Sequence, residues 1–126
     1  MNRTLATISA LLLLAAPLAA HHGWQFDYDD QKPVSVKGTV TKIEWTNPHI
    51  HIYVDTKDAK GQVQPWNFEM ASPLALQRGG WSPKSLLVGD EITVTGFGGK
   101  AVKERAIVSS ITKADGKQLF VGDSSR

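Results

Sequence analysis

The sequence predicts an all-β domain, a small OB-like Greek-key barrel of five to six strands with one short helix between the third and fourth strands. Three observations support this fold class. Short segments with alternating apolar residues recur along the chain, glycine- and proline-containing turns separate them, and a single segment carries a helix-start signature. The chain has no cysteine, so the stability of the domain has to come from its hydrophobic core.

The first strand is predicted to be long and bent. Apolar alternation begins at Val34 and changes phase between Val40 and Ile43, and Gly38 lies just before the change. A bend or a bulge accounts for such a phase change, whereas a straight strand does not.

The second strand follows a turn at residues 46–48 and presents two contrasting faces. One face is purely apolar and must face the core, so the other face points outward. The apolar face consists of Ile50, Ile52 and Val54, and the outward face consists of His49, His51 and Tyr53.

The remaining elements follow in order along the chain. In the third strand, Trp66, Phe68 and Met70 are expected to point inward. Ser72 is a suitable cap for a short helix that has Pro73 at its first position. Three further strands are predicted at residues 91–95, 106–111 and 118–121, separated by glycine-containing turns.

Residues 1–20 are predicted to be a secretory signal peptide. Arg3 precedes an apolar run over residues 5–16, and small residues follow at the end of the segment. The preferred cut follows Ala20, with Ala19 as the alternative. The mature protein would then be periplasmic or secreted, with no stable membrane insertion. It would comprise an extended arm (21–33), the OB-like barrel domain (34–121) and a short tail (122–126).

The charge of the mature chain disfavours nucleic acid as a partner. The whole chain has 14 Lys plus Arg and 12 Asp plus Glu, and removal of the leader takes away Arg3. A nearly neutral protein gives no reason to expect phosphate backbones or acidic membranes as ligands. A protein partner in the cell envelope, or a glycan, remains compatible with this charge.

All four histidines lie close together in the first half of the chain, at His21, His22, His49 and His51. A histidine that begins a mature chain offers both its α-amino nitrogen and its ring to one metal ion. His49 and His51 leave the same strand face with Cα atoms roughly 6.5–7 Å apart, so their rings can converge on a single ion. Nitrogen donors without thiolates favour Cu(II), with Zn(II) or Ni(II) as alternatives.

We expect one composite site in which His21, His49 and His51 are the principal ligands and His22 is a fourth ligand or an outer-shell group. The arm enters at the beginning of the first strand whereas His49 follows its end. The two pairs therefore start at opposite ends of a strand, and the arm must run back along it to reach. The simpler alternatives are two solvent-facing strand histidines and a disordered chain end.

Several motifs indicate a family relationship. They are His21-His22-Gly23-Trp24 after the leader, Asn47-Pro48-His49, Gly79-Gly80-Trp81 and Val88-Gly89-Asp90. Together they resemble a family of short secreted bacterial proteins of unknown function, which implies an exported β-rich domain. The layout is also similar, in fold only, to the periplasmic OB-fold copper- and silver-binding components of metal efflux systems. Those proteins bind metal through methionines, a histidine and a tryptophan, whereas Met70 is here predicted to lie in the core.

The sequence therefore predicts an exported copper carrier, buffer or accessory protein that uses histidine ligands. The alternative is an OB-fold module that binds a protein or glycan partner without metal, through the outer face carrying Tyr53. Asp27, Asp29 and Asp30 could add oxygen ligands, but a solvated acidic turn explains them more simply. No nucleophile motif or phosphate loop is present, so the protein is not expected to be an enzyme.

Overall fold

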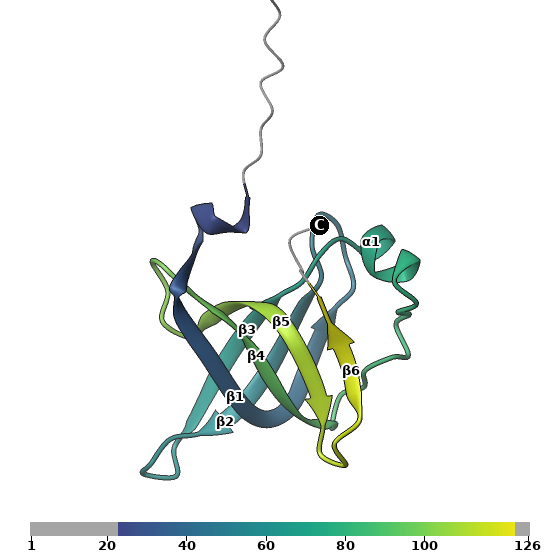
Figure 1. Cartoon of the computed structure of the whole chain (residues 1–126). Helices are drawn as coiled ribbons and strands as arrows, with labels where there is room; N and C mark the ends of the chain where they lie inside the picture. Colours follow the sequence, from purple (N-terminus) through teal and green to yellow (C-terminus); the bar gives the residue numbers. More distant parts are fainter. Residues whose placement is uncertain (1–22, 123–126) are drawn as a thin grey trace, which may run out of the picture.

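The computed structural model describes residues 23–122 and shows a barrel built from one six-stranded sheet (Figure 1). The strand order is β3-β2-β1-β4-β5-β6, and a parallel pairing of β3 with β5 closes the sheet. The elements are η1 (Trp24–Phe26), β1 (Tyr28–Glu44), β2 (His51–Lys57), β3 (Val63–Glu69), α1 (Pro73–Arg78), β4 (Glu91–Gly99), β5 (Arg105–Lys113) and β6 (Gln118–Val121). The predicted all-β, OB-like barrel with one short helix between β3 and β4 is confirmed.

Strand β1 is bent, as its sequence predicts. Its first part pairs with β4 and its last part with β2, and its register shifts between Val40 and Lys42. Gly38 lies at the crossing with β2, where an added Cβ would stand 2.2 Å from the carbonyl oxygen of Asp55. A side chain cannot fit there, so the glycine allows the two strands to approach.

The bend brings both ends of β1 to the same rim of the barrel. A continuous row of paired residues runs around this rim, from Glu44 through His51, Glu69, Ile107 and Phe97 to Pro33. In Figure 1, β1 runs away from this rim and curves back toward it. The arm and His49 do start at opposite ends of β1, as predicted, but the bend brings those ends to the same rim, so the arm need not run back along the strand.

The barrel begins earlier in the chain than the predicted boundary between residues 33 and 34. Strand β1 begins at Tyr28, so the second half of the predicted 21–33 arm belongs to the sheet, and residues 24–26 form a 3-10 turn instead of an extended segment. Tyr28 is fully buried and pairs with Gly99. The Asp27 carbonyl accepts a 2.9 Å hydrogen bond from the backbone of Lys100. These contacts hold residues 27 and 28 against the end of β4 and the loop that follows it.

The barrel interior is apolar and orients the outer face of β2. Ile50, Ile52 and Val54 are all buried, so His49, His51 and Tyr53 point outward as predicted. Met70 is also buried, at 1% exposure, which places its thioether in the core. The core comprises Val36, Val40, Ile50, Ile52, Val54, Phe68, Met70, Ala71, Leu76, Leu86, Ile92, Val94, Ala106, Val108 and Ile111.

Helix α1 begins and ends as the sequence predicts. The hydroxyl oxygen of Ser72 accepts a 3.2 Å hydrogen bond from the backbone of Ala75, with Pro73 at the first helical position. Gly79 ends the helix. Within residues 23–122, no helix is long and apolar enough to cross a membrane. The predicted signal peptide lies outside the described residues.

Candidate functional site

A buried carboxylate at the end of β3 organises the rim of the barrel. Glu69 is only 8% exposed. Its Oε2 accepts hydrogen bonds from the hydroxyl of Tyr28 and, at 2.7 Å, from Nη2 of Arg105. Its Oε1 lies 2.6 Å from Nδ1 of His49. One carboxylate thus joins the starts of β1 and β5 to the loop before β2.

The contacts of Glu69 keep it ionised. Burial opposes its charge, but hydrogen bonds from Tyr28, Arg105 and His49 outweigh burial and lower the pKa of the carboxyl below its usual range. Burial, and next the hydrogen bond to Glu69, raise the pKa of Tyr28 well above its ordinary value. Tyr28 is therefore a neutral phenol that donates. The guanidinium of Arg105 also lies 5.2 Å from the centre of the Tyr28 ring.

The carboxylate of Glu69 determines which ring nitrogen of His49 carries a hydrogen. An ionised carboxylate only accepts hydrogen bonds, so Nδ1 of His49 carries the hydrogen. In the neutral form of the ring, the lone pair therefore lies on Nε2. The side chain is 50% exposed, and Nε2 has no protein hydrogen bond within residues 23–122. That nitrogen is available to a ligand.

His51 has the same arrangement with a neutral partner. Its Nδ1 lies 2.8 Å from Oδ1 of Asn67. An amide oxygen can only accept, so Nδ1 donates and the lone pair again lies on Nε2. His51 faces Glu69 in the β2–β3 ladder and Glu44 in the β1–β2 ladder.

The neighbouring carboxylate Glu44 is already engaged. It contacts the amine of Lys42 at 2.5 Å and accepts a 3.1 Å hydrogen bond from the hydroxyl of Tyr53. The hydrogen bond from Lys42, followed by that from Tyr53, lowers the pKa of Glu44. The amine of Lys42 also lies 5.1 Å from the centre of the Tyr53 ring. Tyr53 is thus held in place beside the histidines.

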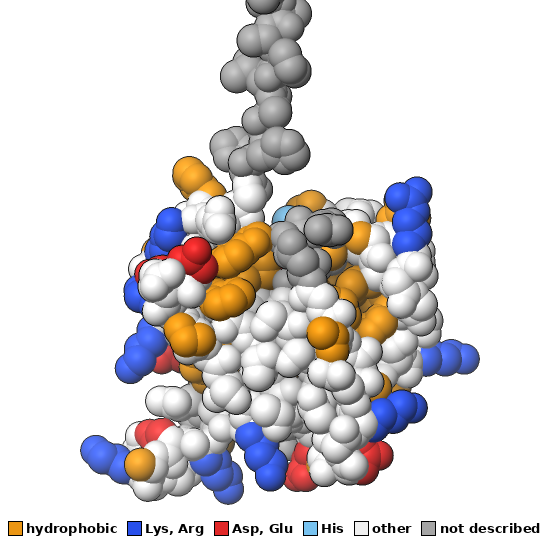
Figure 2. Space-filling view, viewed as in Figure 1, with side chains coloured by type: hydrophobic (Ala, Val, Ile, Leu, Met, Phe, Trp, Pro, Cys, Tyr) orange, Lys and Arg blue, Asp and Glu red, His pale blue; other side chains and the backbone are white. Residues whose placement is uncertain are grey.

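The structure brings two of the four predicted ligands together. His49 and His51 lie on one face of the barrel beside Glu69 and Asn67. A histidine side chain shows in pale blue at the top of the barrel in Figure 2. His21 and His22 lie outside the described residues, and within residues 23–122 no group of three ligating side chains is arranged around a common point. The composite four-histidine site stays a prediction.

The predicted acidic turn makes local contacts. Oδ1 of Asp29 accepts a 2.9 Å hydrogen bond from the backbone of Gln31, and Asp30 accepts one from the Gln31 side chain. The amine of Lys32 lies 4.0 Å from the other oxygen of Asp29. Asp29 and Asp30 thus make only local contacts, but residues 28–30 form the start of β1 and not a turn.

Trp24 and Trp81 pack on neighbours other than the histidines. Trp24 stacks on Phe97 with ring centres 5.1 Å apart. Trp81 meets Phe120 edge to face and donates a 3.1 Å hydrogen bond to the carbonyl of Leu119. Both tryptophans therefore have structural roles in the described part of the chain.

Sequence reasoning missed four residues of this site, namely Tyr28, Asn67, Glu69 and Arg105. A signal existed for two of them, because Asn67 and Glu69 alternate with the inward Phe68 on a predicted strand and so share the outward phase of the histidines. Arg105 had no local signal, since the parallel β3–β5 pairing alone brings it beside β3.

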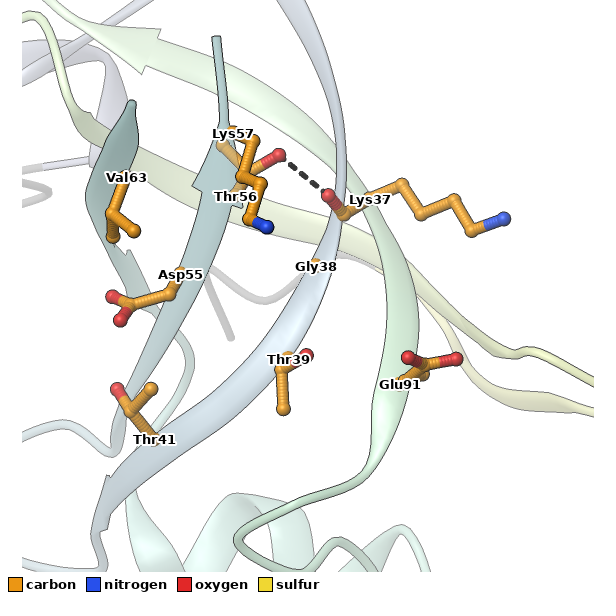
Figure 3. Close-up of a pocket in the computed structure, with 9 residues that line it drawn as sticks. All are labelled: Lys37, Gly38, Thr39, Thr41, Asp55, Thr56, Lys57, Val63 and Glu91. Atoms are coloured by element: carbon orange, nitrogen blue, oxygen red, sulfur yellow. Dashed lines mark hydrogen bonds between the residues drawn. The ribbon is translucent and has the colours of Figure 1, made fainter. Parts of the chain in front are cut away.

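A polar groove of about 670 Å³ lies on the outer face at the bend of β1, away from the histidines (Figure 3). Thr39, Thr41 and Asp55 line it, whereas the amine of Lys37 extends away from them. The hydroxyl of Thr56 donates a 2.6 Å hydrogen bond to the carbonyl of Lys37. The groove is a second hydrogen-bonding surface, distinct from the histidine rim.

Comparison with known proteins places the fold and the family. The solved structure of the mitochondrial single-stranded DNA-binding protein Rim1 from S. cerevisiae is similar, with a TM-score of 0.50 and 11% identity, over 76% of this chain and 99% of that one. At this identity the likeness shows the OB-like fold alone. No curated protein matches the sequence significantly. The model of a family of unknown function, DUF6152, matches residues 10–107, and this protein belongs to that family.

Proposed function

We propose that this protein binds a transition-metal ion, Cu(II) by preference, through the Nε2 atoms of His49 and His51. One observation carries the proposal. Both rings have Nδ1 held by an oxygen acceptor, Glu69 for one and Asn67 for the other, so both present Nε2 on the same outer face. Histidines that ligate metals are typically oriented by such an acceptor on the second ring nitrogen.

The hydrogen bonds that hold the acceptor of His49 in place favour a role for this ring as a metal ligand. Glu69 is itself held by Tyr28 and Arg105, which leaves its carboxylate little freedom to rotate. A negative acceptor on Nδ1 makes the ring a better donor to a metal and reduces the rotational entropy lost on binding. Imidazole ligands suit Cu(II), Zn(II) and Ni(II), and copper leads in intrinsic affinity.

The described part of the chain begins near the same rim, which supports a contribution from the predicted terminal ligands. Trp24 stacks on Phe97, and Phe97 is three strand positions from His51 along the row of paired residues. Three strand spacings amount to roughly 14 Å. His21 precedes Trp24 by three residues, which span about 10 Å when extended, before the imidazole adds its own length. Removal of residues 1–20 would free an amine at His21 for the same ion.

The proposed role is that of a carrier, buffer or accessory protein for copper in the periplasm or outside the cell. We propose binding in place of catalysis because the sequence contains no nucleophile motif. Nucleic acid is not proposed as a ligand, although the similar solved structure is a DNA-binding protein, because the chain carries nearly balanced charge.

The experiment is a calorimetric titration of the protein beginning at His21 with Cu(II), Zn(II) and Ni(II). The His49→Ala/His51→Ala double variant should lose at least about tenfold in affinity, roughly 1.4 kcal/mol. Tyr53→Phe is the matched control, since Tyr53 lies on the same face and is not a proposed ligand. Equal copper affinity in the double variant and the control would refute a role for the rim histidines.

The second candidate is a metal-free module for a glycan or protein partner in the envelope. The hydroxyls and the carboxylate that line the groove in Figure 3 favour it, because sugars are recognised by such groups. A pull-down with envelope glycans and proteins should then depend on Asp55 and Thr39 and be indifferent to His49→Ala/His51→Ala. Binding that needs the histidines instead would exclude this use of the groove.

A further inference from the structure

A cavity of about 430 Å³ opens through the barrel wall where β3 leaves β5. It is independent of the outward-facing histidines, because its floor is formed by Trp66 and Val34, which pack against the core. Its other lining residues include Gly98, Lys32, Lys100 and Lys103. The volume lies within the range of small-molecule sites, about 300–1,000 Å³.

The cavity exists because two irregularities of the sheet meet there. The parallel pairing of β3 with β5 starts at Asn67, so Trp66 lies just beyond the last paired position. On the opposite side, the pairing of β1 with β4 shifts register between Tyr28 and Pro33, which displaces Lys32 from the regular ladder. The wall is therefore open between β3 and the loop after β4.

The residues that line the cavity carry positive charge only, although one of their amines lies near a carboxylate outside the lining. Three lysines line the cavity and no carboxylate does. The amine of Lys100 donates one hydrogen bond to the carbonyl of Gln25, and that of Lys32 lies 4.0 Å from Asp29. The amine of Lys103 has no polar partner within residues 23–122. In a nearly neutral protein, this concentration of one charge around an apolar hollow produces a locally positive potential.

We propose that this cavity binds a small organic anion with a flat apolar body, such as an aromatic carboxylate. The indole of Trp66 stacks on Phe68 with ring centres 5.6 Å apart, and the part of it that lines the cavity offers aromatic surface to a ligand. The lysine amines on the rim offer charge-assisted hydrogen bonds to a carboxylate. A purely inorganic anion would leave the apolar floor without a partner. A neutral aromatic molecule would leave the amines without one.

Gly98 gives a specific way to fill the cavity. A Cβ added there would have its nearest neighbours at 3.5 Å, the atoms of Lys32 and Val34, which is ordinary contact distance. Its φ angle is not positive, so a side chain adds no backbone strain. Gly98→Val therefore fills part of the cavity beside Lys32 and Val34 and removes none of the three lysines. Gly23→Val is the matched control, because a Cβ at Gly23 meets nothing within 4 Å.

The test is a titration with 2-naphthoate followed by amide and indole N–H chemical shifts, with 2-naphthamide and acetate as the neutral and the non-aromatic probes. We expect shifts centred on Gly98, Gly99 and the Trp66 indole, and affinity for naphthoate about tenfold or more above that for either other probe. Gly98→Val should abolish these shifts and Gly23→Val should retain them.

A second variant, Lys32→Gln/Lys103→Gln, keeps the cavity open and reduces its charge. Its affinity for naphthoate should fall to that for naphthamide, and unchanged dispersion of the amide spectrum would show that it is folded. The proposal is overturned if naphthoate and naphthamide bind equally to the native protein, if Gly98→Val retains binding, or if the shifts centre on His49 and His51.

Discussion

The hydroxyl of Tyr28 donates a hydrogen bond to the carboxylate of Glu69 across 41 residues of sequence, and the other oxygen of that carboxylate contacts His49. The start of β1 is thereby connected to the loop before β2 through one buried group. Arg105, from the start of β5, completes the set.

Glu69→Gln should destabilise the protein by about 1.5–3 kcal/mol, because it weakens charge-assisted hydrogen bonds and leaves the Arg105 guanidinium without its counter-charge. Urea unfolding measures the change. Glu44→Gln is the control, since Glu44 is also bonded to a tyrosine and a cation but lies at the surface, where solvent screens ion pairs and they contribute little to stability. Equal losses in the two variants would show that burial of Glu69 adds nothing.

The lowered pKa of Glu69 predicts a loss of stability in acid. The unfolded protein takes up a proton on this carboxyl near its ordinary pKa of 4.5, whereas the folded protein takes it up only at lower pH. The stability that ionised Glu69 contributes is therefore fully present above pH 4.5, and it is lost as the pH falls through the pKa of this carboxyl in the folded protein. The free energy of unfolding of Glu69→Gln should vary less steeply with pH below 4.5. Parallel profiles for native protein and variant would contradict this.

The raised pKa of Tyr28 predicts a loss of stability in alkali. Above pH 10 the unfolded chain releases the phenol proton while the folded protein retains it, so the free energy of unfolding falls as the pH rises. Tyr28→Phe should reduce this slope, because only the smaller contribution of Tyr53, whose pKa burial also raises, remains. The lost hydrogen bond costs about 1 kcal/mol at neutral pH. Absorbance titration checks the assignment, with Tyr53→Phe as the comparison. A first phenol titration that survives in Tyr53→Phe and disappears in Tyr28→Phe would be inconsistent with burial of Tyr28.

Asn67→Leu should weaken copper binding roughly tenfold or more, although the side chain is not a ligand, because the ring of His51 loses the acceptor that orients it. Calorimetry on the protein beginning at His21 measures the affinity. Gln64→Leu is the control, a polar-to-apolar change in the same strand. The outcome that argues against the proposed site is an equal copper affinity in these two variants.

The sequence was sufficient for the fold because alternation and turn residues report local geometry. The phase change before Ile43 revealed the bend, and the apolar Ile50 and Ile52 fixed the outward direction of His49 and His51. The contacts that join the residues of the site were not predictable from the sequence, since they depend on which strands lie side by side. The parallel pairing of β3 with β5 brings Arg105 to Glu69, and no local pattern encodes that pairing.

The segment from Trp24 to Tyr28 shows a second limit of prediction from the sequence. Trp24, Phe26 and Tyr28 alternate with polar residues, a pattern typical of an extended segment such as the predicted 21–33 arm. In the structure Tyr28 is buried in the sheet whereas Phe26 is 72% exposed, so equal spacing hides unequal roles. Hydrogen bonding to Glu69, a tertiary effect, selects Tyr28 as the residue that enters.

Because the carboxylate of Glu69 meets its three donors only after β1, β3 and β5 have come together, the orientation of the His49 ring is a late product of folding. An unfolded polypeptide has no such constraint on that imidazole. Metal binding through its Nε2 would then be a property that the protein acquires only when the barrel closes, so the metal ion would bind after folding and not during synthesis.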